Sequence, residues 1–217
     1  MFFKLKMVND APVMIIADPN GNAWRFANRI YQKLAQHKKS TRKYLLEKIE
    51  ISHHPDGELK SRVKDSVRGH ECYVVHDSSM YPQDWKEGIL QINDALRIAD
   101  AAYINNVLPY MCYTRQDRVT EGRSPISAAL LADNLLDSGV RRIITADLHN
   151  PAVRGKYNKI SFENLKVAYG VLVDHLRNKH PDFLSNAVVA DPDDGASKRT
   201  GGFGERLNLG RVYFDKK

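Results

Sequence analysis

The apolar positions of this chain follow two alternating periods. Short apolar runs at Val13–Ala17 and Cys72–Val75 indicate strands, the first of them buried. Apolar residues recur at helical spacing over Ala23–Gln36 and Trp85–Ala99. Strands that alternate with helices predict an α/β fold with a doubly wound, mostly parallel sheet.

The same alternation continues to the end of the chain. A third helix is expected to begin with Ser124 as N-cap and Pro125 in its first position and to end at Gly139, since these residue types favour helix ends. Two more helices are expected over Phe162–Arg177 and Ser197–Leu207. The remaining expected strands cover Glu47–Ile51, Ala102–Leu108, Arg142–Asp147, Asn186–Ala190 and Arg211–Phe214.

The chain is longer than one ordinary domain. It has 217 residues, whereas domains typically hold about 100 to 150 residues. A boundary near residue 160 gives an N-terminal domain over residues 1–160 and leaves residues 161–217, which are too few for a whole α/β domain. We therefore expect one complete domain followed by part of another.

The positive charge is concentrated in one segment. The chain carries 33 lysines and arginines against 26 acidic residues, a formal net charge of +7. Residues 25–48 hold eight of these basic residues and one acidic residue, so this segment accounts for the whole excess. It is interpreted first as a solvated helix face followed by a basic loop, with an anionic partner or a nucleic acid as alternatives.

Other features exclude several classes of protein. No apolar run approaches the roughly 18 residues that span a bilayer, and the first residues do not resemble a signal peptide. Cys72 and Cys112 are the only cysteines and form no CxxC pair. A cytoplasmic protein without a cysteine zinc site or a membrane segment is therefore expected.

Unusual polar clusters follow four of the expected strands. Carboxyl ends of parallel strands share one sheet edge, where ligands bind in open α/β folds. Arginines there suit phosphate, and aspartates suit Mg²⁺, although each cluster taken alone is also compatible with a turn, a loop cap or a surface salt bridge. The clusters are Asp56–Glu58, Tyr113–Arg118, Asp147–His149 and Asp191–Gly195. Neither a P-loop nor a GxGxxG turn is present.

An ordered set of motifs resembles one known family. Pro109–Arg118 is similar to the PYxxYxRQDR segment of ribose-phosphate pyrophosphokinases, and the similarity continues through Pro125–Ala128, Arg142–His149 and Val188–Asp193. The resemblance extends over nearly the whole chain. It implies two similar phosphoribosyltransferase-like domains, of which the second is incomplete here.

The resemblance also implies an activity. These enzymes transfer the diphosphoryl group of Mg-ATP to the C1 hydroxyl of ribose 5-phosphate for nucleotide biosynthesis, and they form dimer-based oligomers, typically hexamers. Such transfer depends on positioning of the substrates and neutralisation of phosphate charge more than on covalent catalysis. A homo-oligomer is therefore expected. No membrane partner is expected, and a nucleic-acid partner is not favoured.

The resemblance assigns roles to individual residues. Lys216 matches the lysine that opens the catalytic loop of the family. The expected metal ligands are His149, Asp193 and, beside them, Asp147. The expected ATP-binding residues are Asp56, Gly57 and Glu58 (from a neighbouring subunit), Arg115, Gln116, Asp117 and His149.

The sequence also departs from the family pattern. His54 stands where phenylalanine is usual, Ala196 where a second glycine is usual, and Lys217 where arginine is common. The Gly/Thr-rich loop that holds the ribose phosphate in the family has no counterpart in the 217 residues. We therefore expect a truncated form with little activity alone. The alternatives are a non-catalytic subunit associated with a full-length enzyme and a basic nucleic-acid-binding protein.

Overall fold

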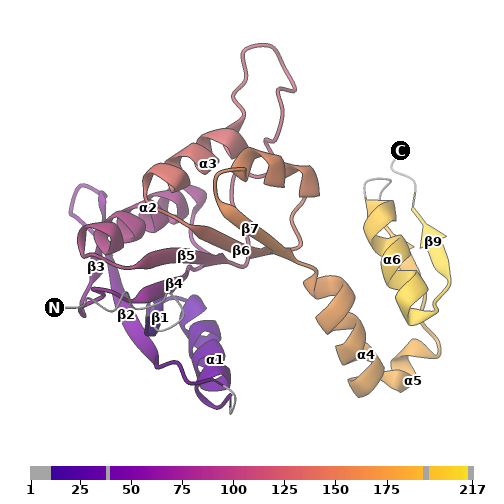
Figure 1. Cartoon of the computed structure of the whole chain (residues 1–217). Helices are drawn as coiled ribbons and strands as arrows, with labels where there is room; N and C mark the ends of the chain where they lie inside the picture. Colours follow the sequence, from indigo (N-terminus) through magenta and orange to yellow (C-terminus); the bar gives the residue numbers. More distant parts are fainter. Residues whose placement is uncertain (1–10, 38–39, 193–195, 215–217) are drawn as a thin grey trace. The chain divides into compact units, whose positions relative to one another are not determined.

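A computed structural model describes residues 11–37, 40–192 and 196–214 of the chain (Figure 1). The chain forms two compact units, residues 1–164 and 165–217, which are described separately below. The interpretation of residues 1–160 and 161–217 as two similar domains remains a prediction.

Unit 1 is built on a seven-stranded sheet with the order β3-β2-β1-β4-β5-β6-β7. Strands β1, β2, β4, β5 and β6 pair in parallel, and β3 pairs antiparallel to β2. The strands are β1 (Val13–Ala17), β2 (Tyr44–His53), β3 (Leu59–Val63), β4 (Glu71–Val75), β5 (Tyr103–Leu108), β6 (Arg142–Ala146) and β7 (Ser161–Leu165). The helices are α1 (Ala23–Ala35), α2 (Pro82–Ile98), α3 (Ser127–Asp137) and the short η2 (Pro151–Tyr157). The expected doubly wound, mostly parallel α/β sheet is confirmed.

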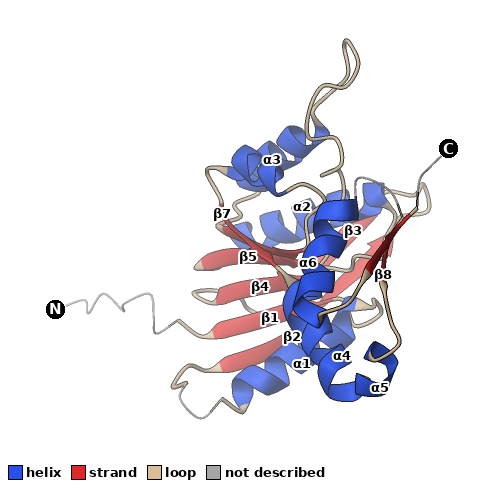
Figure 2. Ribbon diagram, turned by 90° about the vertical axis from the view of Figure 1, so that its right-hand side faces the viewer, coloured by secondary structure: helices blue, strands red, loops and turns tan. Residues whose placement is uncertain are grey.

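Helices cover both faces of this sheet, with α1 on one face and α2 and α3 on the other (Figure 2). Successive side chains of a strand point to opposite faces, so β1 contributes to two separate cores. Met14 and Ile16 pack with the apolar stripe of α2, and Ile15 and Ala17 pack with α1. All four are buried, which explains why β1 is an uninterrupted apolar run.

Unit 2 is a smaller α/β assembly in which β8 (Val189–Asp191) pairs in parallel with β9 (Arg211–Tyr213). Its helices are η3 (Ala168–Leu172), α4 (Val173–Lys179), α5 (Pro181–Leu184) and α6 (Ser197–Leu207). The buried Asp191 carboxylate pairs with Arg211 at 2.6 Å, and Val173 and Leu207 are buried as well. Phe183, Val188, Val212, Tyr213 and Phe214 remain exposed, so this unit buries few of its large apolar side chains.

The structure differs from the sequence-based expectation in two expected elements and one unexpected strand. The helix expected over residues 162–177 is instead β7, followed by η3 and α4. The third helix begins at Ser127 with Ile126 as N-cap, because Ser124 forms a turn in which its hydroxyl donates to the Glu121 carbonyl at 2.6 Å. Strand β3 was not expected. Among the described residues, no helix is long and apolar enough to cross a membrane.

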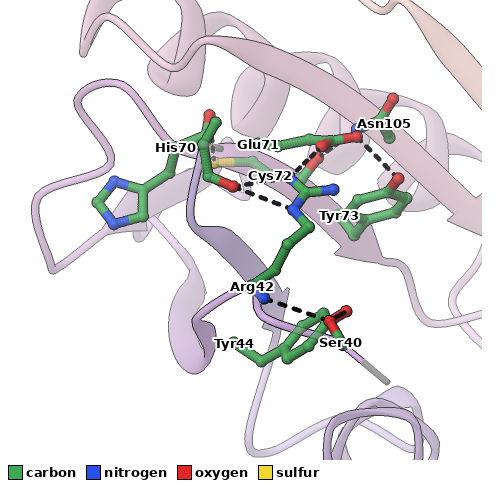
Figure 3. A network of polar contacts seen from close by, with 9 residues as sticks. Ser40, Arg42, Tyr44, His70, Glu71, Cys72, Tyr73 and Asn105 are labelled. Atoms are coloured by element: carbon green, nitrogen blue, oxygen red, sulfur yellow. Dashed lines mark hydrogen bonds and ion pairs between the residues drawn. The ribbon is translucent and has the colours of Figure 1, made fainter. Parts of the chain in front are cut away.

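One member of the basic segment belongs to the internal framework of unit 1 (Figure 3). The guanidinium of Arg42 donates to the carbonyl of Ala11 at 2.7 Å and to the Glu71 carboxylate at 2.6 Å. Glu71 also accepts the hydroxyl of Tyr73 at 2.8 Å. Burial alone would raise the pKa of Glu71, but the hydrogen bonds from Arg42 and Tyr73 lower it. Arg42 therefore joins the entry to β2 with the start of β4.

Candidate functional site

Two loops at the carboxyl edge of the sheet carry half of the expected site residues. The loop after β5 holds Arg115, Gln116 and Asp117, and the loop after β6 holds Asp147 and His149. β5 and β6 are adjacent and parallel, so both loops leave the sheet at the same edge. We call these five residues, together with Asn150, the β5–β6 corner.

A hydrogen bond joins the two loops of this corner. The side-chain amide of Asn150 donates to the Asp117 carboxylate at 2.5 Å. Asn150 also accepts the backbone N–H of Ala152 at 3.0 Å, which makes it the N-cap of η2. This contact places Arg115, two residues before Asp117, and His149, next to Asn150, on loops that are tied together.

Gln116 connects the corner to helix α3. Its side-chain carbonyl accepts the Ser127 hydroxyl, and its backbone carbonyl accepts the Ala128 N–H at 3.1 Å. The first turn of α3 is therefore held by a residue from the preceding loop, since its N-cap Ile126 offers no side-chain acceptor. The side-chain amide nitrogen of Gln116 can donate to a ligand.

The charged groups of the corner face solvent. Arg115, Asp147 and His149 are exposed. Arg115 and Arg118 form no ion pair with another residue that the structure describes. Two guanidinium groups are thus available to an anion at this edge.

The expected metal ligands are only partly described. Asp147 and His149 lie two residues apart on one loop, while Asp193 and the expected catalytic Lys216 fall outside the described residues. Within the described part of the chain, no three His, Cys, Asp or Glu side chains gather closely enough to hold a metal ion.

The turn at residues 56–58 lies at the tip of the β2–β3 hairpin. Its three residues are exposed. Gly57 has φ +94°, which other residues adopt only with strain, and the Asp56 carboxylate accepts the Glu58 N–H at 3.1 Å. Gly57 and Tyr113 line a common cleft of about 350 Å³ with the first turns of α2. The hairpin tip therefore lies beside the start of the loop that carries Arg115.

A second feature at the same edge was missed by the sequence analysis. It is a cleft of about 450 Å³. Its lining residues are Asn22, Ala23, Phe26, His76, Asp77, Ser78, Ser79 and Pro109. We call it the switch-point crevice, because it lies where β1 is flanked by β2 on one side and β4 on the other. The residues come from the start of α1 and from the loops after β4 and β5, which are far apart in the sequence, so no single local motif indicates them.

His76 shows that the wall of this crevice is tightly packed. Its Nε2 lies 2.9 Å from the Trp85 carbonyl, and the side chain is buried. Burial lowers the pKa of His76 to about 4, although the hydrogen bond to Trp85 and the nearby Asp77 act in the opposite direction. The imidazole is therefore neutral at pH 7.

The fold and the β5–β6 corner define an α/β protein that places free cations beside acidic and imidazole groups. Such a mixture suits a phosphate ester that carries a divalent cation, because the arginines bind phosphate oxygens and carboxylates bind the metal.

Comparison with known proteins agrees with this class. Residues 21–139 match the sequence model described as the N-terminal domain of ribose phosphate pyrophosphokinase. The chain belongs to the ribose-phosphate pyrophosphokinase family.

Individual relatives cover most of the chain. It is 37% identical to the ribose-phosphate pyrophosphokinase of Wolinella succinogenes over 81% of this chain and 56% of that protein. It is 33% identical to the Bacillus caldolyticus protein over 88% of this chain and 59% of that protein. The crystal structure of phosphoribosylpyrophosphate synthetase from Mycobacterium smegmatis matches with a TM-score of 0.78 and 25% identity over 95% of this chain and 65% of that chain. The chain thus spans little more than half the length of these curated relatives.

Proposed function

We propose that the chain binds Mg-ATP at the β5–β6 corner and supplies this part of a ribose-phosphate diphosphokinase. In that reaction the diphosphoryl group of ATP moves to the C1 hydroxyl of ribose 5-phosphate, which yields phosphoribosyl pyrophosphate and AMP. The observation that carries the proposal is the Asn150–Asp117 hydrogen bond, which ties the arginine-bearing loop to the loop of Asp147 and His149.

Each corner residue then has a separate task. The Arg115 guanidinium binds phosphate oxygens through its forked donors. The amide nitrogen of Gln116 donates to the ligand while its carbonyl remains bonded to Ser127. Asp117 keeps the loop in place through Asn150, so we assign it a positioning role.

Asp147 and His149 offer groups of the kind that suit a Mg²⁺ ion. Mg²⁺ usually keeps several waters and takes one or two protein carboxylates together with substrate phosphates, so Asp147 and His149, the latter through a bound water, would suffice to hold it. When bound, the ion neutralises negative charge on the phosphates. Asp193 and Lys216 remain proposed members of the site.

The 56–58 turn is proposed to contact ATP that is bound by a neighbouring subunit. It lies exposed at a hairpin tip, which suits a contact between chains. A homo-oligomer is therefore part of the proposal, and sedimentation at several concentrations tests it.

The central experiment is a calorimetric titration of the chain with Mg-ATP. Binding is expected for the unchanged chain, and Arg115→Ala is expected to weaken it at least about tenfold, the usual worth of a charge-assisted hydrogen bond. Arg25→Ala is the matched control, since Arg25 is also an exposed arginine and lies on α1, outside the corner. Loss of binding in Arg25→Ala with none in Arg115→Ala would overturn the proposed site.

Turnover is expected to be low for the chain alone. The chain spans about half the length of its relatives, and the loop that the family uses for the sugar phosphate is absent from its 217 residues. Rapid formation of AMP from ATP and ribose 5-phosphate by the purified chain would contradict this expectation. If the chain instead raises or lowers the turnover of a full-length relative that co-purifies with it, a role as an associated subunit is supported.

One observation favours a second candidate. Arg25, Arg29 and Lys33 are exposed and four residues apart on α1, so they share one face of the helix. Such a stripe suits an anionic partner such as RNA. No retention on RNA at low salt would exclude this alternative.

A further inference from the structure

Among the described strands of unit 1, β3 forms one edge of the sheet, and it lies along helix α2. The outer backbone groups of an edge strand have no further strand to pair with. Here the side-chain amide of Gln91, from α2, takes that place. Its Oε1 accepts the Ser61 N–H at 3.0 Å, and its Nε2 donates to the Leu59 carbonyl at 2.8 Å. One amide thus offers β3 the donor and the acceptor that a neighbouring peptide group would offer.

Gln91 is itself held in place on α2. Its Nε2 also donates to the Glu87 carboxylate at 3.0 Å, one turn earlier on the helix. Both hydrogens of the amide nitrogen are then engaged, which fixes the orientation of the side chain. Helix α2 is anchored in the core of unit 1 by the fully buried Trp85, Ile89 and Ile92. The edge strand is therefore bonded to a rigid element.

The bonds of Gln91 act directly beside the 56–58 turn. Leu59, whose carbonyl Gln91 binds, follows Glu58 in the chain and is buried. The turn is closed by His54, whose N–H donates to the Glu58 carbonyl at 2.8 Å and whose carbonyl accepts the Gly57 N–H at 2.9 Å. A closed turn whose next residue is fixed has little freedom to change its position.

A cleft separates the turn from the first turns of α2. It is the cleft of about 350 Å³ that Gly57 and Leu59 share with Asp84 and neighbouring residues of α2. The imidazole of His53 lies 3.7 Å from the Asp84 carboxylate, but this pair is half exposed and is an ion pair only when the imidazole is protonated. Such pairs contribute little, so the position of the turn depends mainly on Gln91.

We propose that Gln91 is a positioning residue that fixes the β2–β3 hairpin against α2 and so presents Asp56 and Glu58 in a preformed geometry to ATP on a neighbouring subunit. This rests on the proposed function, which assigns that contact to the 56–58 turn. A group that is held in place before its ligand arrives loses less conformational freedom on binding, so the affinity rises without a new contact. The simpler alternative is a side chain that only covers an edge strand.

The test is a double-mutant cycle on the affinity for Mg-ATP, measured by calorimetry under conditions where every variant is folded and has the same oligomeric state. Gln91→Met removes both bonds to β3 and keeps an unbranched side chain of similar length. Asp56→Asn with Glu58→Gln, the turn variant, removes both carboxylates of the turn. Each change is expected to weaken Mg-ATP binding at least about threefold. Because Gln91 acts through the turn, all three substitutions together should bind no more weakly than the weaker of the two, whereas independent effects would multiply.

Two further measurements serve as controls. Lys64→Gln breaks the exposed ion pair between Lys64 and Glu50, at the other end of β3, and should leave the affinity for Mg-ATP unchanged. Hydrogen exchange of the Ser61 amide should be faster in Gln91→Met than in the unchanged chain, because the amide loses its acceptor. Equal exchange in the two chains would overturn the contact from which the proposal starts.

The outcomes separate this inference from the proposed function. Absence of Mg-ATP binding by the unchanged chain would overturn both, and full binding by the turn variant would remove the turn from the site and overturn the inference with it. Binding that the turn variant weakens and Gln91→Met leaves unchanged would overturn the inference alone, as would losses that multiply in the combined variant. If Gln91→Met does not fold, Gln91→Glu, which loses the donor to Leu59, takes its place in the cycle with the same expectations.

Discussion

The β5–β6 corner and the switch-point crevice share one sheet edge, yet they treat charge in opposite ways. In the crevice, Asp77 receives its donors from the same chain and is nearly enclosed. In the corner, Arg115 faces solvent and has no ion-pair partner among the described residues. A charged group with internal partners contributes to folding, whereas one left open is available to a ligand.

The largest expected effect of breaking this contrast is on stability at the crevice. Asp77→Ala leaves the N–H groups of Asn22 and Ser79 without their acceptor and should lower the free energy of unfolding by about 2–3 kcal/mol. Urea denaturation in phosphate-free buffer measures this loss. Arg115→Ala, which removes a group from the open corner, should change stability by less than about 0.5 kcal/mol. Equal losses of unfolding free energy in the two variants would contradict the contrast between a structural charge in the crevice and an open charge in the corner.

The buried His76 predicts a pH dependence of stability at the crevice. The folded-state pKa of His76 is about 4, below the ordinary value of 6.5. The stability that the neutral imidazole contributes is therefore fully present above pH 6.5 and is lost as the pH falls toward 4. This loss should reach about 2 kcal/mol at pH 5. Denaturation at a series of pH values measures it, and His76→Gln should flatten the profile. An unchanged slope in that variant would show that other groups cause the loss.

The basic segment offers the same contrast on a smaller scale. Arg42 is bonded to Glu71 and Ala11, so Arg42→Gln should cost about 1–2 kcal/mol of unfolding free energy. Lys43 is exposed and makes no ion pair with a described residue, and Lys43→Gln should cost less than about 0.5 kcal/mol. Thermal unfolding of the two variants side by side decides whether only the bonded cation is structural.

Among the variants that break a described hydrogen bond, the smallest loss of stability is expected at Asn150 in the corner. Asn150→Ala removes the bond to Asp117 and the cap of η2 and should cost about 1 kcal/mol. The variant should weaken Mg-ATP binding by a larger free energy than it costs in stability, because the two loops lose their connection. Calorimetry and thermal unfolding of the same preparation compare the two effects. A stability loss with unchanged affinity would show that the loop connection does not serve binding.

The fold was largely predictable because its signals are local. The continuous apolar run of β1 and the helically spaced apolar stripe of α2 can each be recognised within a short stretch of sequence. The helix expected over residues 162–177 was wrong over its first part only. Phe162 and Leu165 have helical spacing, but the segment joins the sheet beside β6 as β7 and Phe162 packs in the core, whereas most of the rest of the range is helical. Strand β3 was missed because Leu59–Val63 is apolar only at its two ends.

The candidate site was predictable only where its residues form motifs. Arg115 to Asp117 and Asp147 to His149 lie in contiguous segments, so the sequence alone indicates them. Asn150 and Asp77 gain their roles from partners 33 and 55 positions away, and only the folded sheet brings these partners together. The pairing of Arg42 with Glu71 was hidden in the same way, within a segment interpreted as solvated charge.

The most direct test of this account is the affinity for Mg-ATP of the unchanged chain, Arg115→Ala and Asp77→Asn, measured by calorimetry at a temperature where all three are folded. The account predicts binding by the unchanged chain, a loss of at least about tenfold in Arg115→Ala and no change in Asp77→Asn. Absence of binding, or a loss in Asp77→Asn that Arg115→Ala does not share, would contradict it.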